Sequence, residues 1–108
     1  KTKKLKETIN CYKKILSIND RHEPTLVNLS YIYLLCNEYK KSEQCLLSAI
    51  KLNKNHAVYY KNLGNLYKRQ NLFDKALENY KHALKLDSNI HEAKKGIGLT
   101  LLTQKNMI

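Results

Sequence analysis

Cysteine and histidine are the residues of this 108-residue chain that could bind a metal, form a disulfide or act as nucleophile and base. Cys11 and Cys45 are 34 residues apart, and His22 and His56 have the same separation. If equivalent residues of stacked repeats lie one helix spacing apart, roughly 10 Å, the two thiols cannot form a disulfide. The other Cys and His have no second ligand at the spacing that zinc sites show. We therefore expect free thiols in a reducing compartment and no metal site.

No other arrangement of residues predicts catalysis. The sequence lacks a Ser or Cys nucleophile beside a placeable His base, a Gly-rich phosphate loop and a paired-carboxylate site. Its nine acidic residues are scattered along the chain. No apolar run is long enough to cross a membrane, and no charged start followed by an apolar run predicts a signal peptide. We expect an intracellular, cytoplasmic protein that is not an enzyme, carries no cofactor and does not bind a membrane.

The net charge of +11 is compatible with nucleic-acid binding. Only Arg21 and Arg69 are Arg among the twenty basic residues, so eighteen are Lys. Recognition of phosphates and bases favours the forked Arg side chain over Lys. Lys, Asn, Ile and Tyr are all abundant, as the codons of an AT-rich genome would produce. We interpret most of the charge as compositional and keep RNA or DNA binding by the basic surface as the alternative function.

A period of 34 residues organises the whole chain. One unit spans residues 23–56 and the next spans residues 57–90, while residues 1–22 match the second half of a unit and residues 91–108 match the first half. The aligned positions include Leu29, Leu63 and Ile97; Ser30, Gly64 and Gly98; Tyr33, Tyr67 and Leu101; and Tyr12, Leu46 and Tyr80. Such repetition is typical of solenoids, in which stacked copies bury one continuous core.

Each unit is predicted to be a helical hairpin. Within each half the apolar residues recur at intervals of three and four, which is the helical period. Polar breaks at residues 37–38 and 70–71 separate two helices within a unit. The segments 53–55 and 87–89 carry the Asn, Asp and Ser that end one helix and cap the next. Small residues at Ser30, Gly64 and Gly98 predict close approach of paired helices, because a mid-helix Gly otherwise costs about 1 kcal/mol.

The repeat resembles the tetratricopeptide repeat (TPR) family, whose pattern places W, L, G and Y in the first helix and A, F, A and P later. The matching residues are Tyr60, Leu63, Gly64, Tyr67, Ala76, Tyr80 and Ala83, with Tyr60 in place of Trp and Ser88 in place of Pro. The unit 23–56 departs from the pattern at Leu26, Ser30, Ser42 and Lys54. The resemblance covers essentially the whole chain. It implies one all-α domain, residues 1–108, that forms a right-handed TPR superhelix of antiparallel hairpins.

The first helices of this family line a concave groove, so the resemblance implies a protein–protein interaction module or scaffold. The implied groove residues are Asn28, Tyr31, Lys61, Asn62, Asn65, Lys68, Arg69 and Lys95. The segment 59–70 contains three basic residues and no acidic one, which favours an acidic peptide or protein as the partner. We expect the chain to be part of a longer solenoid.

Two precedents within the family suggest how the groove could bind. Asn28 and Asn62 share one register, which resembles the asparagine ladder of the O-linked N-acetylglucosamine transferases; Gly96 interrupts it, and no glycosyltransferase domain is present. Solvated Asn side chains in an Asn-rich chain are the other interpretation. Lys61 and Asn65 match the opening pair of the carboxylate clamp, which holds the acidic tails of heat-shock chaperones. Gly96 stands where that clamp needs its next Asn, so chaperone-tail binding is a further alternative.

The two ends of the isolated chain predict self-association. Residues 1–22 are a second helix without its first, and residues 91–108 are a first helix without its second, which leaves Tyr12, Ile15 and Leu101 without partners. A large apolar side chain left in water forgoes about 1.5–3 kcal/mol. Complementary opposite ends favour head-to-tail association, with a two-fold dimer as the alternative.

Sedimentation should therefore show association that rises with protein concentration. Because Tyr12→Lys and Leu101→Lys each place a charge on one of the two faces, both variants should associate more weakly. A strictly monomeric profile at millimolar concentration would contradict this prediction.

Overall fold

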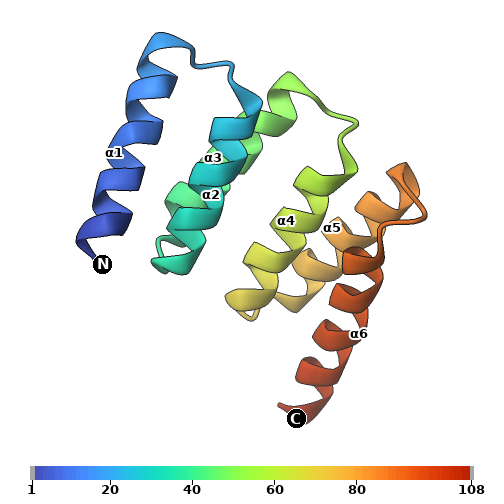
Figure 1. The fold of residues 1–108 in the computed structure, drawn as a ribbon. Helices are drawn as coiled ribbons and strands as arrows, with labels where there is room; N and C mark the ends of the chain where they lie inside the picture. The colour runs from blue at the N-terminus through green and yellow to red at the C-terminus, as the bar shows by residue number, and fades with distance from the viewer. Residues whose placement is uncertain (1, 108) are drawn as a thin grey trace. The chain divides into compact units, whose positions relative to one another are not determined.

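The chain is all-helical in the computed structural model, which describes residues 2–107 (Figure 1). The described residues form six α-helices and no strand. The helices are α1 Lys3–Ile18, α2 Glu23–Leu35, α3 Tyr39–Leu52, α4 Ala57–Arg69, α5 Phe73–Leu86 and α6 His91–Asn106. The all-α fold predicted from the repeated helical period is confirmed.

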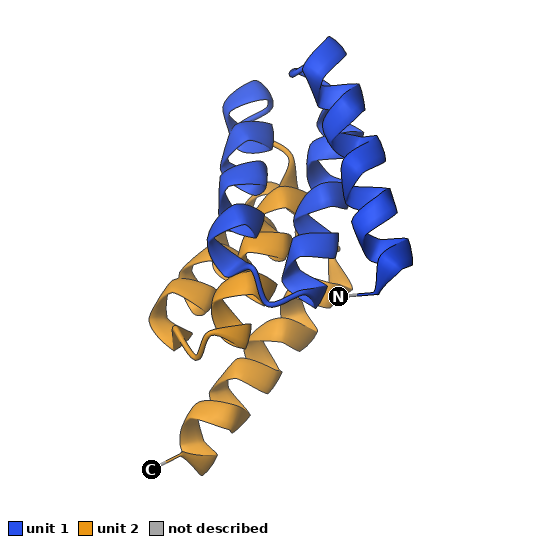
Figure 2. Cartoon of the chain, turned by 90° about the vertical axis from the view of Figure 1, so that its left-hand side faces the viewer, with its two compact units in different colours: residues 1–54 blue, residues 55–108 orange. Residues whose placement is uncertain are grey.

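The helices group into two compact units, coloured separately in Figure 2. Unit 1, residues 1–54, contains α1, α2 and α3, and unit 2, residues 55–108, contains α4, α5 and α6. In unit 1, α2 and α3 form a hairpin, and α1 packs against α2. In unit 2, α4 and α5 form a hairpin, and α6 packs against α5 and also touches α4.

The turn inside each hairpin contains an asparagine with a left-handed backbone. Asn37 has a φ of 60°, and Asn71 has a φ of 61°. The amide of Glu38 donates to the carbonyl of Tyr33 at 2.9 Å, and the equivalent bond in the second hairpin has the same length. This is the Schellman arrangement, in which Asn is the commonest substitute for Gly. The helix breaks predicted at residues 37–38 and 70–71 are confirmed.

The junctions between hairpins differ from the prediction at the helix starts. Asn53 and Asp87 end α3 and α5 as C-caps, as predicted. The N-caps of α2 and α4 are His22 and His56, and the His22 ring accepts from a backbone amide in the first turn. His56 makes no side-chain cap bond, and its ring stacks on Tyr59 with 4.1 Å between centroids. Capping by Asn or Ser is wrong here, because the N-caps of α4 and α6, His56 and Ile90, lie one residue beyond the polar segments.

Unit 1 has a small core between α1, α2 and α3. Its buried residues are Ile9, Leu29, Tyr33 and Cys45, with Tyr12, Leu16 and Ile32 packed against them. The Ser42 hydroxyl donates to the carbonyl of Ser30 at 2.7 Å, which joins α3 directly to the backbone of α2. The close approach predicted at Ser30 is confirmed.

Tyr80 lies at the centre of unit 2. Its side chain is 0% exposed. A Cβ atom on Gly64 would lie 2.6 Å from the Tyr80 ring, and a Cβ atom on Gly96 would lie 2.4 Å from it. Both distances are far inside van der Waals contact, so glycine at both positions lets a ring from α5 reach the backbones of α4 and α6. The contact predicted at Gly64 is confirmed, and Gly96 provides a second one that the repeat pattern did not indicate.

The same expectation is wrong for Gly98, where a Cβ atom would meet nothing within 4 Å. Gly98 lies beside exposed apolar residues of α6, including Leu101, which is 49% exposed. In α1, Ile15 is 41% exposed, whereas Tyr12 packs against the core of unit 1. Exposure of the unpaired helix faces thus holds for Ile15 and Leu101, and Leu101→Lys is the cleaner variant for the self-association test.

Replacing Gly by Leu should have opposite effects on thermal stability at Gly64 and at Gly98. Leu in place of Gly gains about 1 kcal/mol of helix propensity at either Gly64 or Gly98. Only Gly64→Leu must also displace the Tyr80 ring, an overpacking cost of about 1–3 kcal/mol or more. Thermal melting followed by circular dichroism should place Gly64→Leu below the parent and Gly98→Leu at or above it. Equal melting temperatures for the two variants would show that Gly64 is not a helix contact.

Burial of Tyr80 predicts a loss of stability at alkaline pH. Desolvation raises the pKa of its phenol from 10.0 to about 12. The folded state favours the neutral phenol of Tyr80. Its contribution to the free energy of unfolding is therefore complete below pH 10 and is lost as the pH rises towards 12. Two pKa units correspond to about 2–3 kcal/mol.

Denaturant unfolding across this pH range should therefore show a steeper fall in unfolding free energy for the parent than for Tyr80→Phe, which lacks the ionisable hydroxyl. The other Tyr and Lys residues are common to both proteins, so their titration contributes equally to the two pH profiles and cancels in the difference between them. Parallel pH profiles for the two proteins would contradict the prediction.

Candidate functional site

The predicted groove residues of unit 2 lie mainly on one face of α4. The buried residues of this helix are Ala57, Tyr59, Leu63, Gly64, Leu66 and Tyr67. The opposite face carries Lys61, Asn62, Asn65, Lys68 and Arg69, all of them exposed or half-buried. Helical spacing places these five on adjoining turns, because residues three and four apart are neighbours. The structure therefore brings these residues together, and we call them the basic face of α4.

The basic face carries uncompensated positive charge. α4 contains no acidic residue. Lys61, Lys68 and Arg69 have no ion-pair partner within residues 2–107. Lys68 and Arg69 lie in the last turn, where the negative end of the helix dipole favours cations. The helix thus tolerates these charges without neighbouring carboxylates, and they remain available to an anionic group.

Asn65 is the one member of the basic face with a hydrogen bond to the core. The hydroxyl of Tyr80 donates to its Oδ1 atom at 2.5 Å. Tyr80 comes from α5, fifteen residues further along the chain. The repeat pattern predicted Tyr80 as a core residue only. Its aromatic type satisfies the core position, and no signal in the sequence indicates that its hydroxyl reaches α4.

The remaining predicted site residues lie on other helices. Lys95 is exposed on α6, next to the buried Gly96. In unit 1, Asn28 and Tyr31 lie one turn apart on α2. Both are exposed, Tyr31 to 59%. An exposed tyrosine of this size is an apolar surface with a hydroxyl at its tip, which is typical of residues that contact other proteins.

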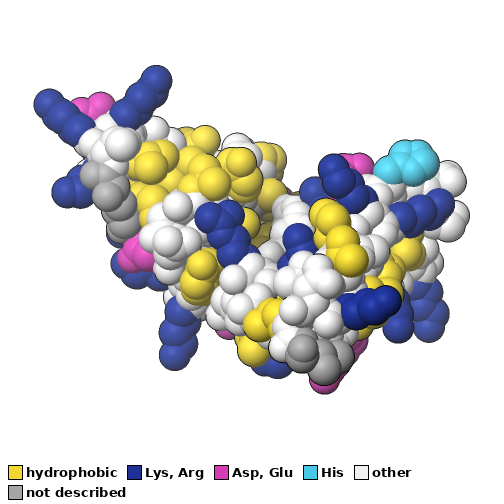
Figure 3. Space-filling view, turned by 90° about the horizontal axis from the view of Figure 1, so that it is seen from below, with side chains coloured by type: hydrophobic (Ala, Val, Ile, Leu, Met, Phe, Trp, Pro, Cys, Tyr) yellow, Lys and Arg dark blue, Asp and Glu magenta, His cyan; other side chains and the backbone are white. Residues whose placement is uncertain are grey.

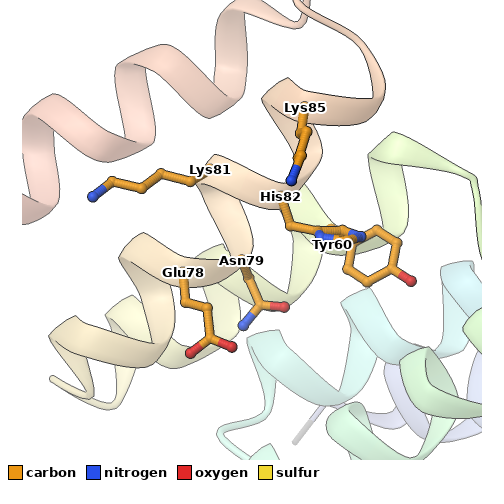
Figure 4. A pocket seen from close by; sticks show the side chains of 6 residues that line it. All are labelled: Tyr60, Glu78, Asn79, Lys81, His82 and Lys85. Atoms are coloured by element: carbon orange, nitrogen blue, oxygen red, sulfur yellow. The ribbon is translucent and has the colours of Figure 1, made fainter.

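A surface pocket of about 420 Å³ lies outside the predicted site (Figure 4). It is lined by Tyr60 of α4 and by Glu78, Asn79, Lys81, His82 and Lys85 of α5. The Tyr60 and His82 rings are in contact, with 4.1 Å between centroids. Figure 4 shows Lys81 extending away from this ring pair. The sequence pattern did not indicate this pocket, because its residues are spread over two helices without a recognisable motif.

The thiols differ in exposure. Cys11 is exposed, Cys36 is half-buried and Cys45 is buried. Desolvation raises the pKa of Cys45 to about 11, so this thiol stays protonated and weakly nucleophilic at neutral pH. Over residues 2–107, no three His, Cys, Asp or Glu side chains are grouped so that they could hold a metal ion.

On the face seen in Figure 3, Lys and Arg side chains project at separate points and do not merge into a single patch. Nucleic-acid surfaces usually concentrate such side chains on one face or along one helix. Among the described helices, none combines the length and the apolar character that crossing a membrane requires.

Two family models match the chain, and both describe the tetratricopeptide repeat. One matches residues 57–90, and the other matches residues 24–56. No curated protein sequence is detectably similar to the chain.

Solved structures share this fold. An O-GlcNAc transferase mutant from Thermobaculum terrenum is 25% identical with a TM-score of 0.81, over 86% of this chain and 18% of the transferase chain. The first TPR of Spaghetti (RPAP3), bound to an HSP90 peptide, is 20% identical with a TM-score of 0.85, over 94% of this chain and 81% of that chain. The second TPR domain of human RPAP3, in complex with an HSP70 peptide, is 17% identical with a TM-score of 0.78, over 85% of this chain and 77% of that chain.

The six packed helices, the 34-residue period and the two adjoining family matches agree with one another. The chain therefore belongs to the tetratricopeptide repeat family, whose domains mediate protein–protein interactions.

Proposed function

We propose that the chain is a protein-interaction module whose basic face of α4 binds an acidic segment of a partner protein. The observation that carries the proposal is the set of three cations without ion-pair partners among residues 2–107, on a helix that lacks acidic residues. Lys and Arg bind carboxylates through charge-assisted hydrogen bonds. The Asn62 amide can bond the backbone of an extended peptide, because it has donors and an acceptor, and the Asn65 amide can donate to a ligand oxygen.

Two other first helices, α6 in unit 2 and α2 in unit 1, carry further proposed contact residues. Lys95 on α6 adds a further exposed cation in unit 2. Asn28 and Tyr31 on α2 are the proposed contacts of unit 1, one polar and one aromatic. Within unit 2, the cations and amides suit a ligand that combines carboxylates with an exposed peptide backbone.

The solved relatives support an acidic ligand but not a particular one. The peptides in the two RPAP3 structures, SRMEEVD and SGPTIEEVD, both end in the acidic sequence EEVD. In this chain Lys61 and Asn65 match the first pair of the carboxylate clamp, but Gly96 stands where its next Asn is needed. Gly96 is buried against Tyr80, so a side chain has no room at this position. Chaperone-tail binding therefore remains the alternative, and a general acidic peptide is the proposal.

Reversing the charge of the basic face should abolish most of the binding. The double variant Lys68→Glu with Arg69→Glu replaces two attractive charges with two repulsive ones. Surface pairs contribute about 0.2–1 kcal/mol each, so four charge units change affinity by roughly tenfold or more. Isothermal titration with a blocked, glutamate-rich peptide measures this change. An unchanged dissociation constant would refute the basic face as the binding site.

The matched control is Lys81→Glu with Lys85→Glu, which makes the same change in net charge on exposed positions of α5. This control should weaken binding less than the α4 variant, because it alters only the long-range field. A lysine-rich peptide should bind the parent more weakly than the glutamate-rich one. Equal affinity for both peptides would contradict an acidic ligand.

Binding to RNA or DNA is the alternative supported by the net charge of +11. It predicts affinity that falls steeply with the logarithm of salt concentration and does not depend on the Asn residues. A mobility-shift titration with a single-stranded oligonucleotide at low salt distinguishes the two functions. Absence of a shift at low salt would remove the nucleic-acid alternative.

A further inference from the structure

Tyr80 connects the core of unit 2 to the basic face of α4. Its ring is fully buried against the α-carbons of Gly64 and Gly96, and its hydroxyl lies 2.5 Å from Oδ1 of Asn65. Asn65 itself is exposed. The hydrogen bond therefore joins a ring held between two helices to an amide that faces solvent.

The direction of this hydrogen bond determines how the amide is oriented. The phenol donates and the amide oxygen accepts. Turning the amide over would place Nδ2 against the hydroxyl and leave the O–H without its acceptor, which is unfavourable for a buried group. Desolvation raises the pKa of Tyr80 to about 12, so the hydroxyl keeps the proton it donates at neutral pH. The Oδ1 atom is thus turned towards Tyr80, and Nδ2 is left to the surface.

Cationic residues lie one turn before and one turn after Asn65 on α4. Lys61 precedes Asn65 by one turn of α4, and Lys68 and Arg69 follow it by one turn. An amide that presents only N–H donors is suited to an acceptor without a proton of its own. Within this row of positive charge, a carboxylate satisfies both the amide and the cations.

We infer that Tyr80 is a positioning residue whose hydroxyl makes Asn65 a donor-only contact for a carboxylate of the acidic peptide. The inference rests on the proposed function and assigns a specificity role to a residue inside the core. The two glycines belong to the same arrangement, because a Cβ atom at either would occupy space that the Tyr80 ring needs. Without the hydroxyl, Asn65 could present either its oxygen or its nitrogen to the ligand.

Tyr80→Phe tests the inference with two peptides. One is the blocked glutamate-rich peptide, and the other carries glutamine at every glutamate position. Affinity for the glutamate peptide should fall about two- to tenfold, the usual worth of one hydrogen bond. Affinity for the glutamine peptide should stay within about twofold, because a glutamine side chain can pair with either orientation of Asn65. A general loosening of the fold would weaken both peptides equally and leave the ratio of their affinities unchanged.

Asn65→Ala is the matched second variant, and it removes an exposed side chain from the surface. In this background, adding Tyr80→Phe should cause no further loss of glutamate-peptide affinity. Asn65→Asp should still accept from the Tyr80 hydroxyl but should lose glutamate binding and keep glutamine binding, because it presents an anion. An equal effect of Asn65→Asp on both peptides would overturn the inference.

A spectroscopic measurement covers the case in which Tyr80→Phe does not fold. The hydrogen-bonded Tyr80 hydroxyl proton should be protected from exchange and visible by nuclear magnetic resonance in the parent, and lost in Asn65→Ala. Absence of a protected signal in the parent would overturn the inference.

If the parent does not bind the glutamate peptide, the proposed function fails. If it binds and Tyr80→Phe keeps the same affinity ratio, only this inference fails.

Discussion

The contact of one aromatic ring with two glycine backbones determines the architecture of unit 2. Tyr80 has no exposed surface, and its ring requires the absence of a Cβ atom on α4 at Gly64 and on α6 at Gly96. Close packing of this kind leaves little freedom, because protein interiors are as dense as organic crystals. The ring therefore sets the distances between α4, α5 and α6. The positions of the surface residues of α4 depend on this packing. In unit 1 the smaller Ser42 hydroxyl joins α3 to the α2 backbone at Ser30.

Most of the fold could be predicted from the sequence, because helical period and repeat register are local signals. The apolar positions of α4 and α5, and the breaks at Asn37 and Asn71, follow from residue type and spacing. Gly98 could not be placed correctly by register alone, since a small residue shows only that close contact is allowed. The contact between Gly96 and Tyr80 could not be predicted from the register either. Its partner is a ring from the preceding helix, and no alignment of repeats displays that contact.

The candidate site was predictable to a lesser extent. Resemblance to the family indicates which face of a first helix is available, and the charges of Lys61, Lys68 and Arg69 are visible in the sequence. The orientation of Asn65 is not, because it depends on a hydrogen bond across fifteen residues from a side chain that looks purely structural. The repeated residues of a solenoid are usually assigned to the core and the variable ones to binding. Tyr80 belongs to both groups, with its ring in one and its hydroxyl in the other.

The nearest-neighbour pattern of helix contacts has a consequence for how the chain folds. The contacts within each unit join helices that are one or two elements apart in sequence, and each hairpin turns within a few residues. Structures built from such local contacts form quickly, since little loop entropy is lost before a contact is made. Either hairpin can therefore nucleate first, and a substitution that slows one leaves the other route open. Asn37 and Asn71 are suited to these short turns, because Asn adopts a left-handed backbone at lower cost than most residues with a Cβ atom.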